Sequence, residues 1–390
     1  MIEINDYQTA LKALRHQGLA QALYEKSPII MADVLLTLEG DAHRDRRALE
    51  YRVFNRHALF DYEKSVFPQI FLPVLARSRE SGQLDLVEMG YRIVMNLTAD
   101  FAGIDRHEGT LEETDLLLRL IKAFSAAATI AHSNLDHDAV NQAALAALDQ
   151  LDNTFLQPAI ARRQALMSAG REMPKDVLSA LLQSKAQLAG EVLRREIAFY
   201  LQAGAHSTAN STVHAMHEIL TWCEHDATRR ERILSDRRLL QRCVHEALRL
   251  HPASPVSLRR STEALELAGH RLQPGDLVCI NLEAANRDPL IFGDDANDFR
   301  PTRDLPRGVR PFGLSFGFGI HACLGRDLDG GVVPNARTRP EEMQMGIVAL
   351  IIEKLLINGA RWIEGQPPEP DADTARNNFS VYPIALEQAA

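Results

Sequence analysis

Apolar residues recur at intervals of three and four through most of positions 1–250, and this periodicity predicts a mainly helical chain. The longest pattern of this kind spans residues 191–224. The predicted helix over residues 139–156 is expected to stop before Pro158, because proline breaks a helix interior. The predicted helices are 5–16, 84–101, 116–128, 139–156, 177–182, 191–224 and 239–250.

Alternation and turn residues replace this periodicity after position 255 and predict a strand-rich region. Residues 256–260, 264–268 and 277–280 are the expected strands, with a turn at Pro274-Gly275. Paired glycines and two prolines then predict an inserted loop over 329–340, and the helical pattern resumes near Glu341. This loop could alter the recognition of a partner, or it could be a surface loop without a function.

Composition narrows the class of protein. A chain of 390 residues with 46% hydrophobic and 24% charged residues can bury a large core, and we treat 1–390 as one domain. Its formal net charge of −9 argues against nucleic acid as a partner. Four cysteines without paired spacing suggest no disulfide framework. Without a signal peptide or an apolar run of membrane-spanning length, the chain is expected to be soluble and cytoplasmic.

The candidate chemistry lies in a glycine-rich, aromatic stretch around one cysteine. Glycines permit backbone conformations and close approaches that would let such a loop wrap one sulfur against a flat ligand. A thiolate held in this way is a metal ligand or a nucleophile, whereas the alternative is a buried, inert thiol. The pattern Phe316-x-x-Gly319-x-His321-x-Cys323-x-Gly325 resembles the haem-binding loop of the cytochrome P450 family, in which the cysteine is the axial ligand of haem iron.

Two further segments add to the resemblance. His43 and Arg47 are four residues apart, so a helix would project both from one face, either as a solvated surface or as a clamp for an anion. They resemble the family's helix that holds a haem propionate. The resemblance implies Arg259 as the second propionate clamp, with Arg260 as the competing choice. A strand would point these two neighbours to opposite faces.

The centre of the longest helical pattern resembles the family's oxygen-activating helix, but with a departure. Gly204 is costly inside a helix, and close approach of a flat macrocycle is one reason for it. His206 occupies the position of the usual acid, Ser207 that of the usual threonine, and Thr208 follows. His206 is interpreted either as a proton relay or as a packed side chain.

A supporting network is also implied. Glu246 and Arg249 share a helix face, and taken alone they would be an ordinary surface pair. The resemblance implies instead the family's Glu-x-x-Arg pair, joined by Arg303, as structural residues that support the haem loop.

Together, the motifs resemble those of the cytochrome P450 family in type and in order along the chain. This implies a mainly α fold, a helical prism with a small β-sheet region, here N-terminally shortened. It also implies haem b (iron protoporphyrin IX) bound through Cys323, with dioxygen activated and an apolar small molecule hydroxylated, in secondary or catabolic metabolism. Electrons would come from a separate donor, such as a ferredoxin with its reductase. The proposed site residues are catalytic His206, Ser207 and Thr208, and cofactor-binding His43, Arg47, Gly204, Arg259, Phe316, His321, Cys323 and Gly325.

Two other functions stay open at this point. One is a haem-thiolate enzyme that uses peroxide, or that couples or rearranges its substrate, because the oxygen-activating helix is altered. The other is a haem-binding protein without turnover.

Overall fold

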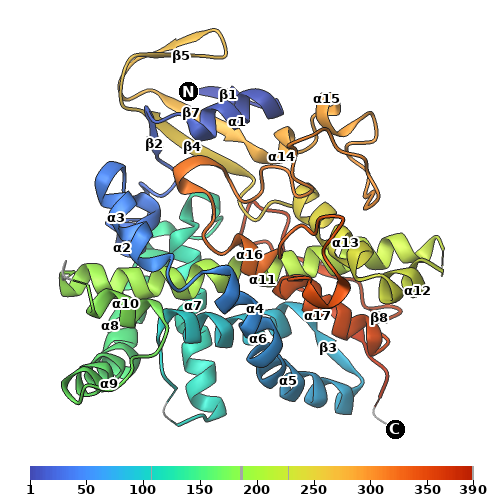
Figure 1. The fold of residues 1–390 in the computed structure, drawn as a ribbon, viewed down its shortest axis with the longest axis horizontal. Helices are drawn as coiled ribbons and strands as arrows, with labels where there is room; N and C mark the ends of the chain where they lie inside the picture. Colours follow the sequence, from blue (N-terminus) through green and yellow to red (C-terminus); the bar gives the residue numbers. More distant parts are fainter. Residues whose placement is uncertain (107, 185–187, 227, 389–390) are drawn as a thin grey trace.

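Helices make up most of the fold (Figure 1). The computed structural model describes residues 1–106, 108–184, 188–226 and 228–388. The α-helices are α1 (Tyr7–Arg15), α2 (Pro28–Met31), α3 (Gly40–Glu50), α4 (Arg56–Ser65), α5 (Phe67–Ser81), α6 (Leu86–Ala102), α7 (Leu111–Ala128), α8 (His137–Leu151), α9 (Gln157–Ser168), α10 (Val177–Leu182), α11 (Gly190–Glu224), α12 (Thr228–Ser235), α13 (Arg237–Leu250), α14 (Leu282–Ala285), α15 (Pro289–Phe292), α16 (Arg326–Asp329) and α17 (Ile347–Ile357). The short 3-10 and π segments are η1 (Leu35–Thr37), η2 (Ile130–His132), η3 (Asp152–Leu156), η4 (Gly319–His321) and η5 (Pro340–Glu342).

Helix α11 crosses the middle of the molecule and packs against α6 (Figure 1). The two helices approach closely at small residues: a Cβ on Gly90 of α6 would lie 3.4 Å from the Cα of Ala209. Although α11 has 35 residues, neither it nor any other helix within the described ranges is long and apolar enough to cross a membrane. Many apolar side chains of α11 are buried and belong to the large core.

The strands form small sheets at the edges of the helical body. They are β1 (Ile2–Ile4), β2 (Leu19–Gln21), β3 (Gln83–Asp85), β4 (Val256–Ser261), β5 (Leu265–Leu267), β6 (His270–Leu272), β7 (Leu277–Asn281), β8 (Arg361–Trp362), β9 (Glu369–Pro370), β10 (Phe379–Val381) and β11 (Pro383–Ala385). The largest sheet has the order β1-β7-β4-β2 and lies with α1 at the top of Figure 1, over a second, smaller apolar core. Strand β4 alternates between buried and half-buried positions, so neighbouring residues face opposite sides.

The predicted end of a helix at Pro158 is wrong. The chain continues from α8 through the π-helical segment η3 into α9, and Pro158 sits in the first turn of α9. Pro158 has no N–H to donate, and the hydrogen-bond pattern changes from π to α directly before it, so the helix passes the proline without ending. Likewise, helix α17 begins at Ile347 and not near Glu341, where only the short η5 turn forms.

Helix α3 is fixed on α11 by two buried carboxylates. The Arg46 guanidinium pairs with Glu196 of α11, and Glu196 also accepts from the backbone nitrogen of Leu35 at 3.0 Å. Glu50, at the end of α3, accepts a hydrogen bond from the Tyr200 hydroxyl at 2.5 Å. Burial raises the pKa of Glu196 to about 7, and it raises the pKa of Glu50 well above its usual value. These contacts determine which face of α3 is turned towards the interior.

The inserted loop leaves and re-enters the fold at nearly one point. A Cβ on Gly331 would lie 2.3 Å from the backbone oxygen of Met345, and one on Gly346 would lie 2.3 Å from the nitrogen of Gly331. Both glycines have positive φ, so only glycine suits this crossing. The buried Glu63 carboxylate accepts from the backbone nitrogens of Met345 and Gly346 at 3.0 and 2.8 Å. Between α16 and α17 the chain runs as a loop from 330 to 346, interrupted by η5, and is therefore longer than the predicted loop over 329–340.

Candidate functional site: a cavity beside Cys323

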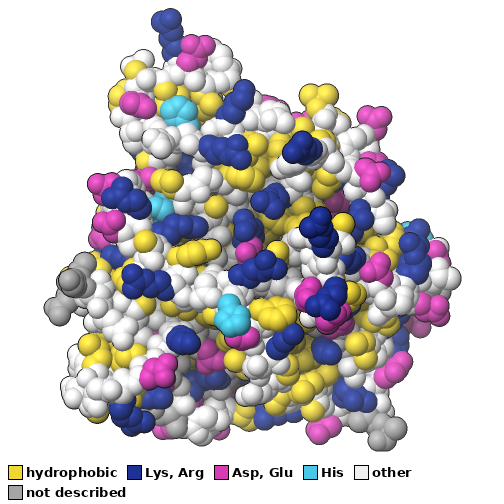
Figure 2. Space-filling model, viewed as in Figure 1, with side chains coloured by type: hydrophobic (Ala, Val, Ile, Leu, Met, Phe, Trp, Pro, Cys, Tyr) yellow, Lys and Arg dark blue, Asp and Glu magenta, His cyan; other side chains and the backbone are white. Residues whose placement is uncertain are grey.

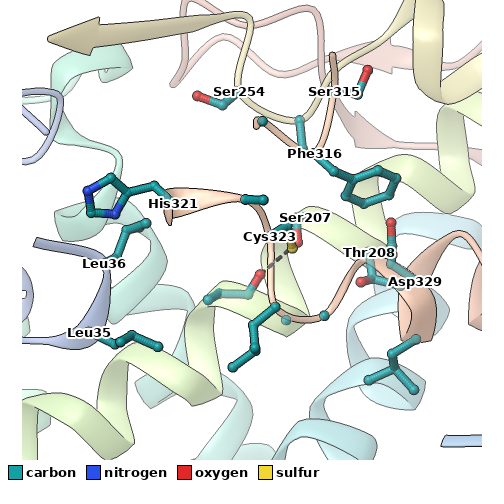
Figure 3. A pocket seen from close by; sticks show the side chains of 18 of the residues that line it. Leu35, Leu36, Ser207, Thr208, Ser254, Ser315, Phe316, His321, Cys323 and Asp329 are labelled. Atoms are coloured by element: carbon teal, nitrogen blue, oxygen red, sulfur yellow. Dashed lines mark hydrogen bonds between the residues drawn. The ribbon is translucent and has the colours of Figure 1, made fainter. Parts of the chain in front are cut away.

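A cavity of about 320 Å³ lies between α11, the loop that carries Cys323, α3, α6 and β4. Figure 3 shows Cys323 and His321 on this loop, with Ser207 and Thr208 of α11 beside it. The lining surface is mostly apolar, and its polar groups come from several elements, including the cysteine loop, α3, α11 and β4. Such a lining is typical of a small-molecule or cofactor site.

The cysteine loop is shaped by backbone hydrogen bonds and by glycines. The nitrogen of Cys323 donates to the oxygen of Phe316 at 2.8 Å and closes the loop. Gly319 has a φ of +76°, and a Cβ there would lie 2.6 Å from the backbone oxygen of Leu14 in α1. Phe316 lines the cavity and meets Phe312 edge-on, with ring centroids 5.0 Å apart. The loop is therefore built tightly enough to hold one sulfur in place.

Cys323 lines the cavity and is an exposed residue. Burial, followed by the negative charge of Asp329, raises the pKa of the Cys323 thiol to about 11. A backbone hydrogen bond from Gly325, the Arg47 charge and the Arg326 charge act in the opposite direction. The protein alone thus keeps the thiol neutral, and a bound metal ion would be needed to make it a thiolate.

Arg259 of β4 reaches the cavity, whereas Arg260 does not. Arg259 is 3% exposed, lines the cavity, and its Nε and Nη1 atoms have no hydrogen-bond partner. Burial lowers the pKa of Arg259 from its usual value. Arg260 lies on the opposite side of the strand and pairs with Glu25 at the surface, with Nε 2.8 Å from Oε1. A buried guanidinium with unused donors is the strongest sign of an anion site in the described chain.

His43, Arg47 and His321 lie on the same wall of the cavity. The rings of His43 and His321 meet with centroids 4.7 Å apart, and Arg47 Nη2 donates to the oxygen of Ala322 at 2.8 Å. His321 Nε2 contacts Glu39 Oε1 at 2.9 Å, while its Nδ1 is buried without a partner. Burial, together with the charges of His321 and Arg47, lowers the pKa of His43 to about 4. The three predicted clamp residues are thus brought together with Arg259.

On the opposite wall, Ser207 and Thr208 of α11 face the cavity. The Ser207 hydroxyl donates to the oxygen of Ala203 at 2.6 Å. Gly204 also lines the cavity, but its missing side chain has a packing reason as well. A Cβ there would lie 2.3 Å from Cγ2 of Thr98 in α6. The close packing of α6 and α11 accounts for this glycine without any ligand.

His206 does not line the cavity. Its Nδ1 lies 2.6 Å from the Tyr91 hydroxyl, and Arg376 Nη1 lies 3.1 Å from its Nε2. Since a guanidinium can only donate, Nε2 accepts, and the ring proton lies on Nδ1 and is donated to Tyr91. Burial, then the charge of Arg376, lowers the pKa of His206 to about 3. Both ring nitrogens are therefore engaged away from the cavity, in a neutral imidazole.

The predicted Glu-x-x-Arg network is present and buried. Arg249, which is fully buried, donates to both carboxylate oxygens of Glu246 at 2.8 Å. Arg303 donates to Glu246 at 3.3 Å and also pairs with Asp295. Arg249 Nη1 further donates to the backbone oxygen of Asn286 at 2.6 Å. The network ties α13 to the chain that leads into the cysteine loop.

Sequence reasoning assigned no role to two residues of the site. Asn286 joins the network to the loop: its Oδ1 accepts from the nitrogen of Leu314 at 2.7 Å, and its Nδ2 donates to Ser315 Oγ at 2.9 Å. Asp329 lines the cavity, although it was read only as the start of the inserted loop. The stretch Asn286-Arg287-Asp288-Pro289 resembles the family's sequence at this point, but the local pattern gives neither residue a role, because both roles depend on contacts between distant segments.

Comparison with known proteins places these features in one family. A family model described as Cytochrome P450 matches residues 117–328. Cytochrome P450 734A1 of Arabidopsis thaliana is 27% identical over 191 residues, which span 43% of this chain and 36% of that protein. A cytochrome P450 of Bacillus subtilis is 33% identical over 162 residues, 40% of this chain and 37% of that protein. In both alignments the chain spans little more than a third of the relative's length.

The fold extends the match over nearly the whole chain. The crystal structure of CYP109E1 from Bacillus megaterium in complex with testosterone aligns with a TM-score of 0.74 and 19% identity, covering 98% of this chain and 92% of that one. This likeness concerns the fold. The predicted mainly α architecture with small sheets is confirmed.

Loss of Arg249 is expected to be far more damaging than loss of its exposed neighbour Arg300. Removing one partner of a buried ion pair costs ~3–5 kcal/mol, so Arg249→Ala should lower the free energy of unfolding by about that amount. Arg300, also paired with Asp295, is largely exposed, and Arg300→Ala should leave that free energy nearly unchanged. Urea denaturation of both variants measures the difference. Equal effects would contradict a supporting role for the buried network.

Proposed function

Since the chain belongs to the cytochrome P450 family, we propose that it is a haem-thiolate monooxygenase that inserts one atom of dioxygen into an apolar small molecule. The observation that supports this best is the position of Cys323, whose thiol opens onto an apolar cavity next to an unpaired, buried guanidinium. The other oxygen atom would leave as water, and this takes two electrons and two protons from outside the substrate.

The residues around the cavity fit haem b. A haem carries two propionate carboxylates, and the free Nε and Nη1 donors of Arg259 lack the anion that would satisfy them. Gly325 lies close to Cys323, and no other atom would come within 4 Å of a Cβ placed on it, so this part of the lining leaves room for a flat group. When bound through a thiolate, haem iron supplies the chemistry of O–O bond cleavage.

The roles of the cofactor-binding residues follow from their places. Cys323 would be the iron ligand, and the Gly325 N–H that reaches its sulfur would tune it. His43, Arg47, Arg259 and His321 would hold the propionates. Phe316 would cover the sulfur from one side, because its ring lines the cavity beside the loop.

Proton handling is assigned to the hydroxyls that face the cavity. Ser207 and Thr208 lie on the wall formed by α11, and both can donate and accept. His206 is proposed to act as a positioning residue for α11 and not as a relay, because its neutral ring is held by Tyr91 and Arg376 outside the cavity. The Ser207 hydroxyl would take the place of the hydroxyl of the threonine that the family usually has at this position.

The electron donor is proposed to be a separate acidic protein, such as a ferredoxin with its reductase. Figure 2 shows that Lys and Arg side chains gather over the middle of the face that carries α16 and α13, although the chain has a net charge of −9. Such a gathering of positive charge would attract an acidic partner to this face.

Ligation by Cys323 can be tested with the visible spectrum of the reduced protein under carbon monoxide. The wild-type holoprotein is expected to show the red-shifted Soret band of a thiolate ligand, and Cys323→Ala should lose it. Cys279→Ala serves as the control, since Cys279 lies on β7 away from the cavity, and it should keep the band. A wild-type band typical of histidine or neutral-thiol ligation would overturn the proposal.

Arg259 and Arg260 form a matched pair for testing the propionate clamp. Arg259→Ala should weaken haem binding by roughly 10- to 100-fold, because hydrogen bonds to charged groups contribute about 1.5–3 kcal/mol. Arg260→Ala should bind haem like the wild type, because Arg260 faces Glu25 at the surface. Titration of the apoprotein with haem gives both affinities. The same loss in both variants would argue against the clamp.

Measuring product formation with dioxygen and reductant, and separately with peroxide, distinguishes a monooxygenase from a peroxide-using enzyme. Because His206 replaces an acid and Ser207 is tied to Ala203, a peroxide-using enzyme is the second candidate. With a ligand that perturbs the haem spectrum, the proposal expects a product that carries labelled oxygen from dioxygen when reductant is supplied. Product with peroxide alone would favour the second candidate. No product under either condition would indicate a haem-binding protein without turnover.

A further inference from the structure

Arg376, in the segment between β9 and β10, uses only part of its guanidinium within the described structure. Its Nη1 lies 3.1 Å from His206 Nε2 and donates to the backbone oxygen of Ala253 at 3.1 Å. Its Nε is buried and has no hydrogen-bond partner. No hydrogen bond of its Nη2 is found among the residues that the structure describes. The edge formed by Nε and Nη2 is therefore unused.

The same edge binds carboxylates elsewhere in this chain. Arg249 donates to the two oxygens of Glu246 from Nε and Nη2, both at 2.8 Å. Arg260 contacts the two oxygens of Glu25 with these same atoms, at 2.8 and 2.5 Å. The spacing of the two donors matches the two oxygens of a carboxylate. The unused edge of Arg376 therefore has the geometry that a carboxylate needs.

Arg376 also differs from other arginines that have a buried nitrogen without a hydrogen-bond partner. Of these, Arg194 and Arg237 nevertheless form ion pairs with carboxylates. Arg259 and Arg376 form none within the described ranges. The haem propionates account for Arg259 in the proposed function. They leave Arg376 without an anion, and a buried cation without one is costly.

Arg376 borders the cavity that contains Cys323. Ala253, whose oxygen accepts from Arg376, lines this cavity, and so does the next residue, Ser254 (Figure 3). Tyr24 lines it as well. Burial raises the pKa of Tyr24, and the charge of Arg376 is the largest influence that opposes this shift. A ligand whose polar end lay at this border would have its body in the apolar part of the cavity.

The segment that carries Arg376 is fixed on η2. The nitrogen of Ala375 donates to the backbone oxygen of His132 at 2.8 Å, and Thr374 Oγ1 donates to the same oxygen at 3.2 Å. The His132 Nε2 atom is buried and has no partner. Burial, followed by the charge of Arg376, lowers the pKa of His132 to about 4, so its ring is neutral at pH 7. The guanidinium is thus held in place before any ligand binds.

We propose that the Nε–Nη2 edge of Arg376 binds the carboxylate of an amphipathic substrate whose apolar body lies in the cavity. This inference rests on the proposed function and names the class of its substrate, an apolar carboxylic acid. A purely structural role would need only Nη1, which contacts His206 and Ala253. It gives no reason for a buried fork of donors without an acceptor.

The test compares two probes of equal chain length, octanoate and octan-1-ol, by calorimetric titration of the haem-loaded protein. The wild type should bind octanoate more tightly. Arg376→Gln should weaken octanoate binding by roughly 10- to 100-fold, because hydrogen bonds to a charged group are lost, and should leave octan-1-ol binding nearly unchanged. Arg271→Gln is the control, since Arg271 is exposed on β6 and does not line the cavity. It should keep both affinities.

A second variant keeps the inference testable if Arg376→Gln fails to fold. Arg376→Lys retains a positive charge but cannot present two donors side by side. Its octanoate affinity should lie between those of the wild type and Arg376→Gln, with octan-1-ol binding unchanged. Excess sodium acetate tests whether a free anion occupies the site. Acetate has no apolar body and should not displace octanoate.

The outcomes separate this inference from the function on which it rests. Equal losses for octanoate and octan-1-ol in Arg376→Gln would indicate a structural role and overturn the inference. Displacement of octanoate by acetate would also overturn it, because the site would then take a free anion. Calorimetry does not depend on the axial ligand of the haem. Absence of the thiolate Soret band in the wild type would therefore overturn the haem-thiolate function, whereas loss of carboxylate selectivity with that band intact overturns only the role of Arg376.

Discussion

The buried carboxylate of Glu246, shared by Arg249 and Arg303, is the interaction on which the site depends. Two buried guanidinium groups are stable only if their N–H donors are hydrogen-bonded. The backbone oxygens of the segment from Asn286 to Asp298 provide the acceptors that Glu246 does not. This fixes the segment against α13. Asn286 is hydrogen-bonded to Leu314 and Ser315. The position of the start of the cysteine loop therefore depends on the ion network.

The cavity is electrostatically divided. On one wall, Arg259 has unused donors, with Arg47 and His321 beside it, and on the other wall lie the hydroxyls of Ser207 and Thr208 and the carboxylate of Asp329. Such an arrangement orients an amphipathic ligand whose anionic edge points one way and whose flat apolar body fills the rest. Cys323 lies where the body of such a ligand would pass, which is why ligation and orientation are set by the same fold.

Much of this was readable in the sequence, because helical periodicity and the cysteine motif are local patterns. The boundaries of residues 177–182 were predicted without error, since Asp176 caps that helix through its own side chain. The remainder depends on distant contacts. Strand alternation shows that Arg259 and Arg260 face opposite sides, but only the packing of β4 shows which side is the cavity. The packing of Gly204 on Thr98 is equally invisible in a local pattern.

The inserted loop explains why a costly carboxylate stays in the cavity wall. The nitrogen of Asp329 donates to the oxygen of Gly325 at 2.9 Å, and the next residue, Gly330, accepts from His245 Nε2 at 2.7 Å. Directly beyond, Gly331 and Gly346 cross at a contact that leaves no room for a side chain. With its backbone fixed on both sides, Asp329 has little freedom to turn its carboxylate towards solvent. Its carboxylate is therefore kept in the cavity wall by the geometry of the surrounding chain.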